Sequence, residues 1–250
     1  MAFALVAQGQ SKGTTPSTAQ DISAAKLLIG VQSYSTGAPA TPSDGVETWI
    51  PLTAAENLFT IASRLWYVLN PTPDASYQVQ AGASCTFAYL AFSADGTILF
   101  DDEADNEIST NASSFVDQEV FTPNQNDSLM ISAAAGAGGS LTTWISVNGG
   151  YSIDEVTDSS GGSTVAAAIG FLLQGTAAAT SPRWTSDATG TCFCNAHGAS
   201  FYESGGGGFD PATLPHVAQP ALLPPKRDVV SYRRRLSGLF VPSYPHYALG

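Results

Sequence analysis

The chain has 250 residues, of which 12% are charged, 24 are glycine and 15 are proline. This charged share is about half that of an ordinary globular domain, and the many small residues are typical of a β-rich protein. The formal charge of −12 argues against a nucleic-acid binder whose affinity comes from neutralising phosphates. A chain of this length can bury a core that folds without metal or disulfide support.

The charge is distributed unevenly along the chain. Residues 1–210 hold 20 acidic and 4 basic side chains, whereas residues 211–250 hold 5 basic side chains and 1 acidic one. A basic segment that follows an acidic one is suited to binding the acidic surface of a neighbouring copy or of another partner.

The sequence predicts neither a signal peptide nor a membrane span. The N-terminus lacks a basic region, and its apolar stretch ends at Ala7. The longest apolar run, Val165–Leu173, is far shorter than the roughly 20 residues that a membrane-spanning helix needs. We therefore expect synthesis in a cytoplasm and no membrane partner.

Short apolar or alternating runs, separated by turn clusters such as Asn70–Asp74 and Thr122–Asp127, fill the first 200 residues. The spacing predicts an all-β fold, an antiparallel β-sandwich of jelly-roll-like type. We predict strands at Phe3–Gln8, Lys26–Tyr34, Trp49–Leu52, Ser63–Asn70, Tyr77–Ala81, Cys85–Ser93, Gln118–Thr122, Ser128–Ala134, Tyr151–Val156, Thr164–Gln174, Arg183–Thr185 and Thr191–Tyr202.

Two segments are ambiguous between helix and strand. The run Val165–Leu173 is rich in alanine, but the glycines and serines around it provide no helix cap, so we predict a strand. Thr53–Ala62 is the best candidate for a short helix, with a loop as the alternative.

Gly205–Gly208 marks an abrupt change of composition. Four consecutive glycines favour a flexible joint, and residues 211–250 then contain 7 of the 15 prolines. We predict a β-sandwich at residues 1–204 (the body), a hinge at 205–210 and an extended basic arm at 211–250 (the arm). A disordered tail is the alternative to an arm that lies on a surface.

Apolar side chains flank the basic residues of the arm. Its charges are suited to an acidic groove on a neighbouring subunit or to nucleic acid, and the acidic body favours the groove. Flanking apolar side chains would fill pockets on the same partner. The candidate partner-binding residues are Lys226, Arg227, Tyr232, Arg233, Arg234, Arg235, Leu239 and Phe240.

The acidic stretch Asp101–Glu107 places carboxylates close together, as a calcium loop does. It lacks the glycine and the final glutamate of an EF-hand, which favours a solvated acidic loop over a Ca²⁺ site. Adjacent carboxylates also lack the opposed placement of a glycosidase acid pair.

The odd number of cysteines does not indicate a disulfide framework. Cys85, Cys192 and Cys194 together with His197 could bind zinc, but buried core thiols are the simpler interpretation. The sequence contains no Gly-x-Ser-x-Gly elbow and no phosphate-binding loop. We therefore predict no enzyme activity, no cofactor and no metal.

Several framework segments, in order, resemble a β-sandwich module of tailed-bacteriophage virion proteins. They are Val46–Leu52, Ser63–Pro71, Ala88–Ser93, Thr122–Ile131, Gly150–Ile153 and Gly175–Trp184. The resemblance covers about residues 1–200 and implies a virion appendage, such as a decoration, collar or fibre component. The arm departs from the pattern, because the modules that the chain resembles usually end near the last strand.

We therefore expect a non-enzymatic structural protein of the virion that binds other virion proteins and copies of itself through the arm. The alternative is a receptor- or carbohydrate-binding module in which exposed tryptophans stack on sugars. Its candidates are Trp49, Trp66, Trp144 and Trp184. The two hypotheses differ in whether these indoles are buried or line one surface.

Overall fold

A computed structural model of the chain describes residues 3–35, 41–56, 61–109, 115–137, 141, 143–153, 155–157, 165–188 and 192–204. Only the backbone is described at 54–56, 61, 105–109 and 155–157. The predicted hinge and the arm lie outside the described residues. Within these ranges there is no helix, and hence none long and apolar enough to cross a membrane.

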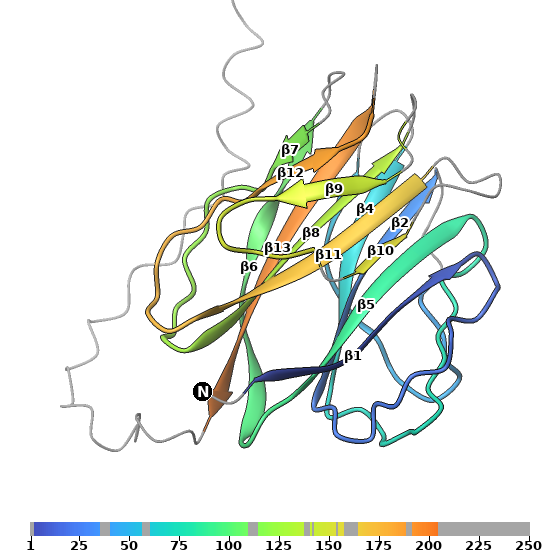
Figure 1. The fold of residues 1–250 in the computed structure, drawn as a ribbon, viewed down its shortest axis with the longest axis vertical. Coiled ribbons are helices and arrows are strands. Elements are labelled where there is room, and N and C mark those ends of the chain that lie inside the picture. The colour runs from blue at the N-terminus through green and yellow to red at the C-terminus, as the bar shows by residue number, and fades with distance from the viewer. Residues whose placement is uncertain are drawn as a thin grey trace, which may run out of the picture. The chain divides into compact units, whose positions relative to one another are not determined.

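The described strands form three antiparallel sheets (Figure 1). The first five-stranded sheet has the order β1 (Ala4–Lys12), β5 (Cys85–Ser93), β2 (Leu27–Ser35), β4 (Ile61–Leu69) and β3 (Ile50–Glu56). The second has the order β10 (Glu155–Thr157), β11 (Val165–Gln174), β8 (Ser128–Ala137), β13 (Phe193–Ser204) and β6 (Thr97–Ser109). A three-stranded sheet contains β7 (Phe115–Asp117), β12 (Arg183–Ser186) and β9 (Trp144–Val147).

The two five-stranded sheets pack face to face and enclose the main core. Ile29 and Val31 of the first sheet and Ile131 of the second belong to one buried cluster. Phe92 meets Phe171 across the sheets with ring centroids 5.0 Å apart. Burying each such side chain stabilises the fold by about 1.5–3 kcal/mol relative to leaving it exposed. The predicted antiparallel β-sandwich is thereby confirmed.

Both outer faces of this sandwich are covered as well. Loops at residues 13–26, 41–49 and 70–84 supply Ile22, Trp49 and Val79 to a second buried cluster on the first sheet. The three-stranded sheet supplies Trp144 and Trp184 to a third cluster on the second sheet. The central strand β8 is consequently buried at every position.

Several predicted elements need correction. Thr53–Ala62 is not a helix, because residues 53–56 belong to β3 and residues 61–62 to β4, while 57–60 lie outside the described residues. Tyr77–Ala81 forms isolated bridges to Gln20 and Ser43 in the covering layer instead of a strand. The predicted strand at Val165–Leu173 is confirmed as β11.

Two further predicted strands are largely loop. In Gln118–Thr122, the structure shows one isolated bridge, between Phe121 and Thr180. Tyr151–Val156 reaches strand geometry at Glu155, where β10 begins. Both segments place a large ring, Phe121 or Tyr151, over the second sheet. Burial of these side chains produces the apolar pattern that favours strands in the sequence.

Side chains pack so closely on the outer face of the first sheet that one added methyl group should destabilise the fold. A Cβ on Gly30 of β2 would lie 2.3 Å from the Phe87 ring, so we expect Gly30→Ala to lower the free energy of unfolding by about 1–3 kcal/mol in urea denaturation. Gly175→Ala is the matched control, because its Cβ would meet nothing closer than 3.8 Å. Equal stability of the two variants would contradict this packing.

Candidate functional site

The residues predicted to bind a partner cannot be placed in the fold. Lys226, Arg227, Tyr232, Arg233–Arg235, Leu239 and Phe240 all lie outside the described residues, so their role stays a prediction. The described body provides the other half of the hypothesis, the surface on which an arm from a neighbouring copy would lie.

The few basic side chains of the body are engaged locally. Arg183 donates two hydrogen bonds to Asp117, at 2.6 and 2.7 Å, and its guanidinium lies 4.2 Å from the centroid of the Phe115 ring. These hydrogen bonds lower the pKa of Asp117. Lys26 donates to two backbone carbonyls in the turn between β5 and β6. Arg183 and Asp117 form an ion pair, and the described body holds far more carboxylates than basic side chains.

The acidic stretch is a strand where it was expected to be a loop. Asp101, Asp102 and Glu103 lie on β6, which pairs with β13. Asp101 accepts hydrogen bonds from the backbone N–H of Asn124 and the hydroxyl of Ser200. The carboxylates therefore satisfy donors on neighbouring segments, and the described residues contain no group of acidic, histidine or cysteine side chains suited to a metal ion.

Glu103 joins the two main sheets at this edge. Its carboxylate accepts the Thr53 N–H at 3.0 Å and the Thr53 hydroxyl at 2.6 Å, and Thr53 belongs to β3 of the other sheet. The negative charge of Glu103 also contributes, after burial, to the raised pKa of Tyr67. Part of the acidic stretch thus has a structural use, while its net negative charge remains on the body.

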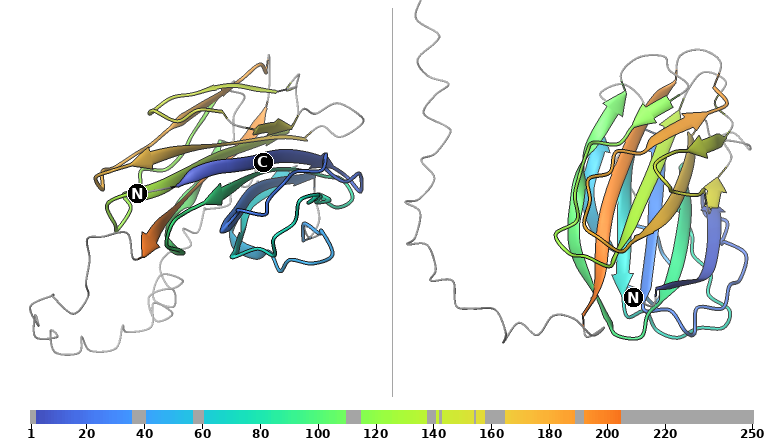
Figure 2. Two further views of the ribbon diagram at one scale, coloured as in Figure 1. Left: turned by 60° about the horizontal axis from the view of Figure 1, so that its bottom comes forward. Right: turned by 60° about the vertical axis from the view of Figure 1, so that its left-hand side comes forward.

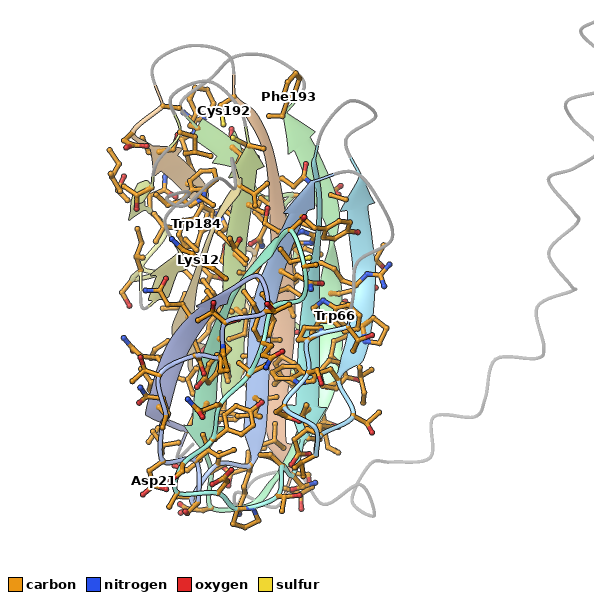
Figure 3. All side chains as sticks on the ribbon, turned by 90° about the vertical axis from the view of Figure 1, so that its right-hand side faces the viewer. Lys12, Asp21, Trp66, Trp184, Cys192 and Phe193 are labelled. Carbon is orange, nitrogen blue, oxygen red and sulfur yellow. The ribbon has the colours of Figure 1, made fainter. Side chains whose placement is uncertain are left out.

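The four tryptophans are buried, although not between the two main sheets. Trp66 lies under the loops on the first sheet and Trp184 under the three-stranded sheet, on opposite sides of the body (Figure 3). Trp49 packs edge-on against Phe87 at 5.1 Å, and Trp144 packs against Trp184 at 6.2 Å. None of these indoles exposes more than 4% of its surface, so they cannot stack on a sugar from solvent.

The three cysteines are free and buried, as predicted for core thiols. Cys85 belongs to the first sheet and packs under its loops, whereas Cys192 and Cys194 lie under the three-stranded sheet with sulfurs 3.1 Å apart. Their hydrogen bond lowers the pKa of Cys192 and raises that of Cys194. His197 points to the other face of β13, so the residues considered for zinc do not converge.

A polar cluster that was not predicted from the sequence is buried between the main sheets. The hydroxyl of Ser63 on β4 lies 2.6 Å from Nε2 of His197 on β13, and Asn195 Nδ2 donates to the same hydroxyl at 3.0 Å. Ser63, Ser33 and Thr86 form a row of hydroxyl side chains across the first sheet, because Ser33 is the register partner of both Ser63 and Thr86. All five side chains are buried.

The serine–histidine contact resembles a nucleophile and its base, but its surroundings do not suit that chemistry. Ser63 exposes 0% and His197 2% of its surface, so no substrate has access from solvent. Burial lowers the pKa of His197 to about 3, with a smaller contribution from the charge of Arg64, so the imidazole resists protonation. We interpret the cluster as a polar contact that fixes the two sheets relative to each other.

The sequence carries a weak signal for this cluster. Ser63 lies two residues before the buried Leu65 and therefore on the same face of β4. His197 likewise shares the inward face of β13 with the buried Ala199 and Phe201. This two-residue spacing indicates that both polar side chains point inward. It does not indicate that they meet, because 134 residues separate them in the chain. Their pairing depends on how the two sheets are stacked.

Comparisons with protein-family models, with curated proteins and with solved structures found no match to this chain. Function is therefore inferred from the residues and geometry of the chain itself.

The buried histidine predicts a loss of stability in acid. His197 has a pKa of about 3 in the folded chain and an ordinary value of 6.5 when unfolded, so the unfolded state alone gains its proton between these values. Stability from this group is present above pH 6.5 and falls by up to about 1.4 kcal/mol per pH unit below it. We expect His197→Gln to have a shallower loss of unfolding free energy than the wild type between pH 6.5 and 4.5.

Titration of the wild-type His197 ring by NMR provides a check that does not require a stable variant. The ring protons are expected to show no titration above pH 4.5. A midpoint near 6.5 would contradict the burial of this side chain.

The buried cysteines predict a simple pattern of thiol reactivity. We expect the three thiols to react slowly with a chromogenic disulfide reagent in the native chain and completely in guanidinium chloride, because all are shielded from solvent. Ile145→Cys is the control, since that position is 58% exposed and should add one rapidly reacting thiol. Rapid native labelling of the wild type would overturn the core assignment.

Proposed function

We propose that the chain is a non-enzymatic structural protein of a tailed-phage virion, whose arm binds the acidic body of a neighbouring copy or of another virion protein. The resemblance of residues 1–200 to virion β-sandwich modules supports this class of particle. A decoration, collar or tail appendage fits this assignment, and the final location of the chain is then the virion.

The observation that carries the proposal is the separation of charge between body and arm. Residues 1–210 have 16 more acidic than basic side chains, while the arm has an excess of 4 basic ones. The described basic side chains of the body bind their own neighbours, as Arg183 binds Asp117. The body therefore carries a large excess of negative charge, which the basic arm of another copy can complement.

The distribution of aromatic side chains supports a structural role over sugar binding. All four tryptophans are used to attach the covering layers to the two main sheets. The residues that the carbohydrate-binding alternative requires at the surface are thus not there, and no other described feature favours that alternative.

The length of the arm supports a lasting contact. Ordering 40 residues costs conformational entropy that a small, transient interface does not offset. Apolar residues such as Leu239 and Phe240 would provide the buried anchors, and the arginines would set the register against carboxylates.

Charge reversal in the arm tests this mode of binding in the full chain. The bait is an immobilised copy carrying Arg233→Glu, Arg234→Glu and Arg235→Glu, which keeps an acidic body but cannot donate a basic arm. We expect it to capture wild-type chains at least about tenfold better than chains with the same reversed arm, because Arg–carboxylate contacts are lost. The triple Arg→Lys variant is the control and should be captured nearly as well as the wild type.

Two results would contradict the proposal. Equal capture of the wild-type and reversed-arm chains would show that the arm does not bind the body. Absence of the protein from purified particles, tested by immunodetection against the free lysate, would contradict the virion assignment.

A further inference from the structure

The strand β1 presents an open edge of the first main sheet. It pairs with β5 on one side, and among the described residues no strand lies on its other side. Figure 2 (right) shows it as the outermost strand at that side of the sandwich. The backbone N–H and C=O groups of such an edge can pair with a strand from another chain.

The other described edges are protected in ways that β1 is not. Pro51 interrupts β3, and β6 carries Asp101–Glu103 and two register shifts. The edge strands β7, β9 and β10 have only three or four residues. By contrast, β1 has nine residues, contains no proline and has one register shift, near Val6. Short length, proline, charge and bulges are the usual protections against edge pairing, so β1 is the edge most open to it.

The side chains of β1 suit an identical strand. No residue from Ala4 to Ser11 is charged, so two copies can approach here without opposing the carboxylates of their acidic bodies. Gln8 and Gln10 are exposed and lie on the same face of β1, the face of the sheet that also carries their register partners Leu90 and Ala88. Gly9 between them lies against Tyr89 on the other face, where a Cβ would come within 2.8 Å of the ring. Glutamine side chains donate and accept hydrogen bonds, so this face is complementary to itself.

We propose that β1 is a homotypic interface, in which two copies pair their β1 strands antiparallel about a two-fold axis at Gly9. The regular part of the strand, Ala7–Ser11, then forms the ladder, and the two first sheets become one continuous sheet. In this register Gln8 lies opposite Gln10 of the partner subunit, and the symmetry repeats the pair.

The place where the chain leaves the body fits this arrangement. Ser204, the last described residue, is the register partner of Thr97, and Glu203 accepts a hydrogen bond from the N–H of Gly96. The turn that holds Gly96 follows β5, whose Ser93 donates to the carbonyl of Ala4. The exit therefore lies at the Ala4 end of β1. An antiparallel partner brings its Lys12 end to this same end of the sandwich.

Sedimentation of the full chain tests the interface separately from the arm. All measurements use the reversed-arm background, Arg233→Glu with Arg234→Glu and Arg235→Glu, so that contacts made by the arm are absent. We expect a concentration-dependent dimer whose dissociation constant rises at least about tenfold in Gln8→Glu/Gln10→Glu, because each glutamate then faces a like charge. Ile145→Glu/Ser146→Glu adds the same charge at exposed positions of β9 and should leave the dimer intact.

Cross-linking tests the register. Directly opposite residues of an antiparallel pair have Cβ atoms about 4.5–5.5 Å apart, against about 7–8 Å for diagonal neighbours. Mild oxidation should therefore convert Gln8→Cys/Gln10→Cys to a covalent dimer, while Gln8→Cys alone should form one much more slowly.

Three results would overturn the interface. The first is a reversed-arm chain that remains monomeric at every accessible concentration. The second is a Gln8→Glu/Gln10→Glu variant that dimerises as well as its parent. The third is equal cross-linking of the double and single cysteine variants. A dimer that survives reversal of the arm would support this interface even if the arm proves not to bind the body.

Discussion

The structure depends on covering both faces of both main sheets. An antiparallel sheet commonly has one face in the core and one in water, but here β8 is buried at every position and β5 at all but its last. A two-layer sandwich would expose the outward side chains of these strands. The loops on the first sheet and the three-stranded sheet on the second are therefore required by the apolar character of the central strands.

The two covering layers bury the outer faces of the main sheets with different side chains. On the first sheet, large rings such as Trp66 and Tyr89 are buried under irregular loops, and Gln32 joins the layers by accepting the Trp66 N–H and donating to the carbonyl of Ala81. On the second sheet, small alanines such as Ala134 and Ala168 let a regular sheet approach, and Trp184 fills the space. Its N–H donates to Ser132, whose own hydroxyl donates to Gln118.

The sequence predicted most of the sandwich strands because their pattern is local. Alternation and turn residues located β2, β4, β5, β8, β11 and β13. The covering layers were predicted poorly, since Tyr77 and Val79 have the apolar spacing of a strand, yet their segment forms isolated bridges to Gln20 and Ser43 and no strand. The strand β6 was missed because its carboxylates suggested a loop. Their stabilising partners, Asn124, Ser200 and Thr53, are distant in the chain.

The same limit applies to the candidate site. Ser63 and His197 are joined only by the stacking of two sheets, which no local pattern encodes. The charge asymmetry, by contrast, is a property of composition and is read directly from the sequence. Contacts within the body are therefore described by their atomic partners, whereas the contacts that we propose for the arm rest on its charge and apolar pattern.

Charge and edge protection together restrict how copies of this chain can assemble. Two acidic bodies repel each other over most of their surface, and an assembly of identical chains needs either an uncharged contact or a source of positive charge. The first is present at β1 and the second in the arm. The acidic strand β6 has the reverse role, because Asp101 and Asp102 disfavour pairing of that edge with another copy. One set of carboxylates thus disfavours random edge pairing and, in the assembly that we propose, provides the surface to which the basic arm binds.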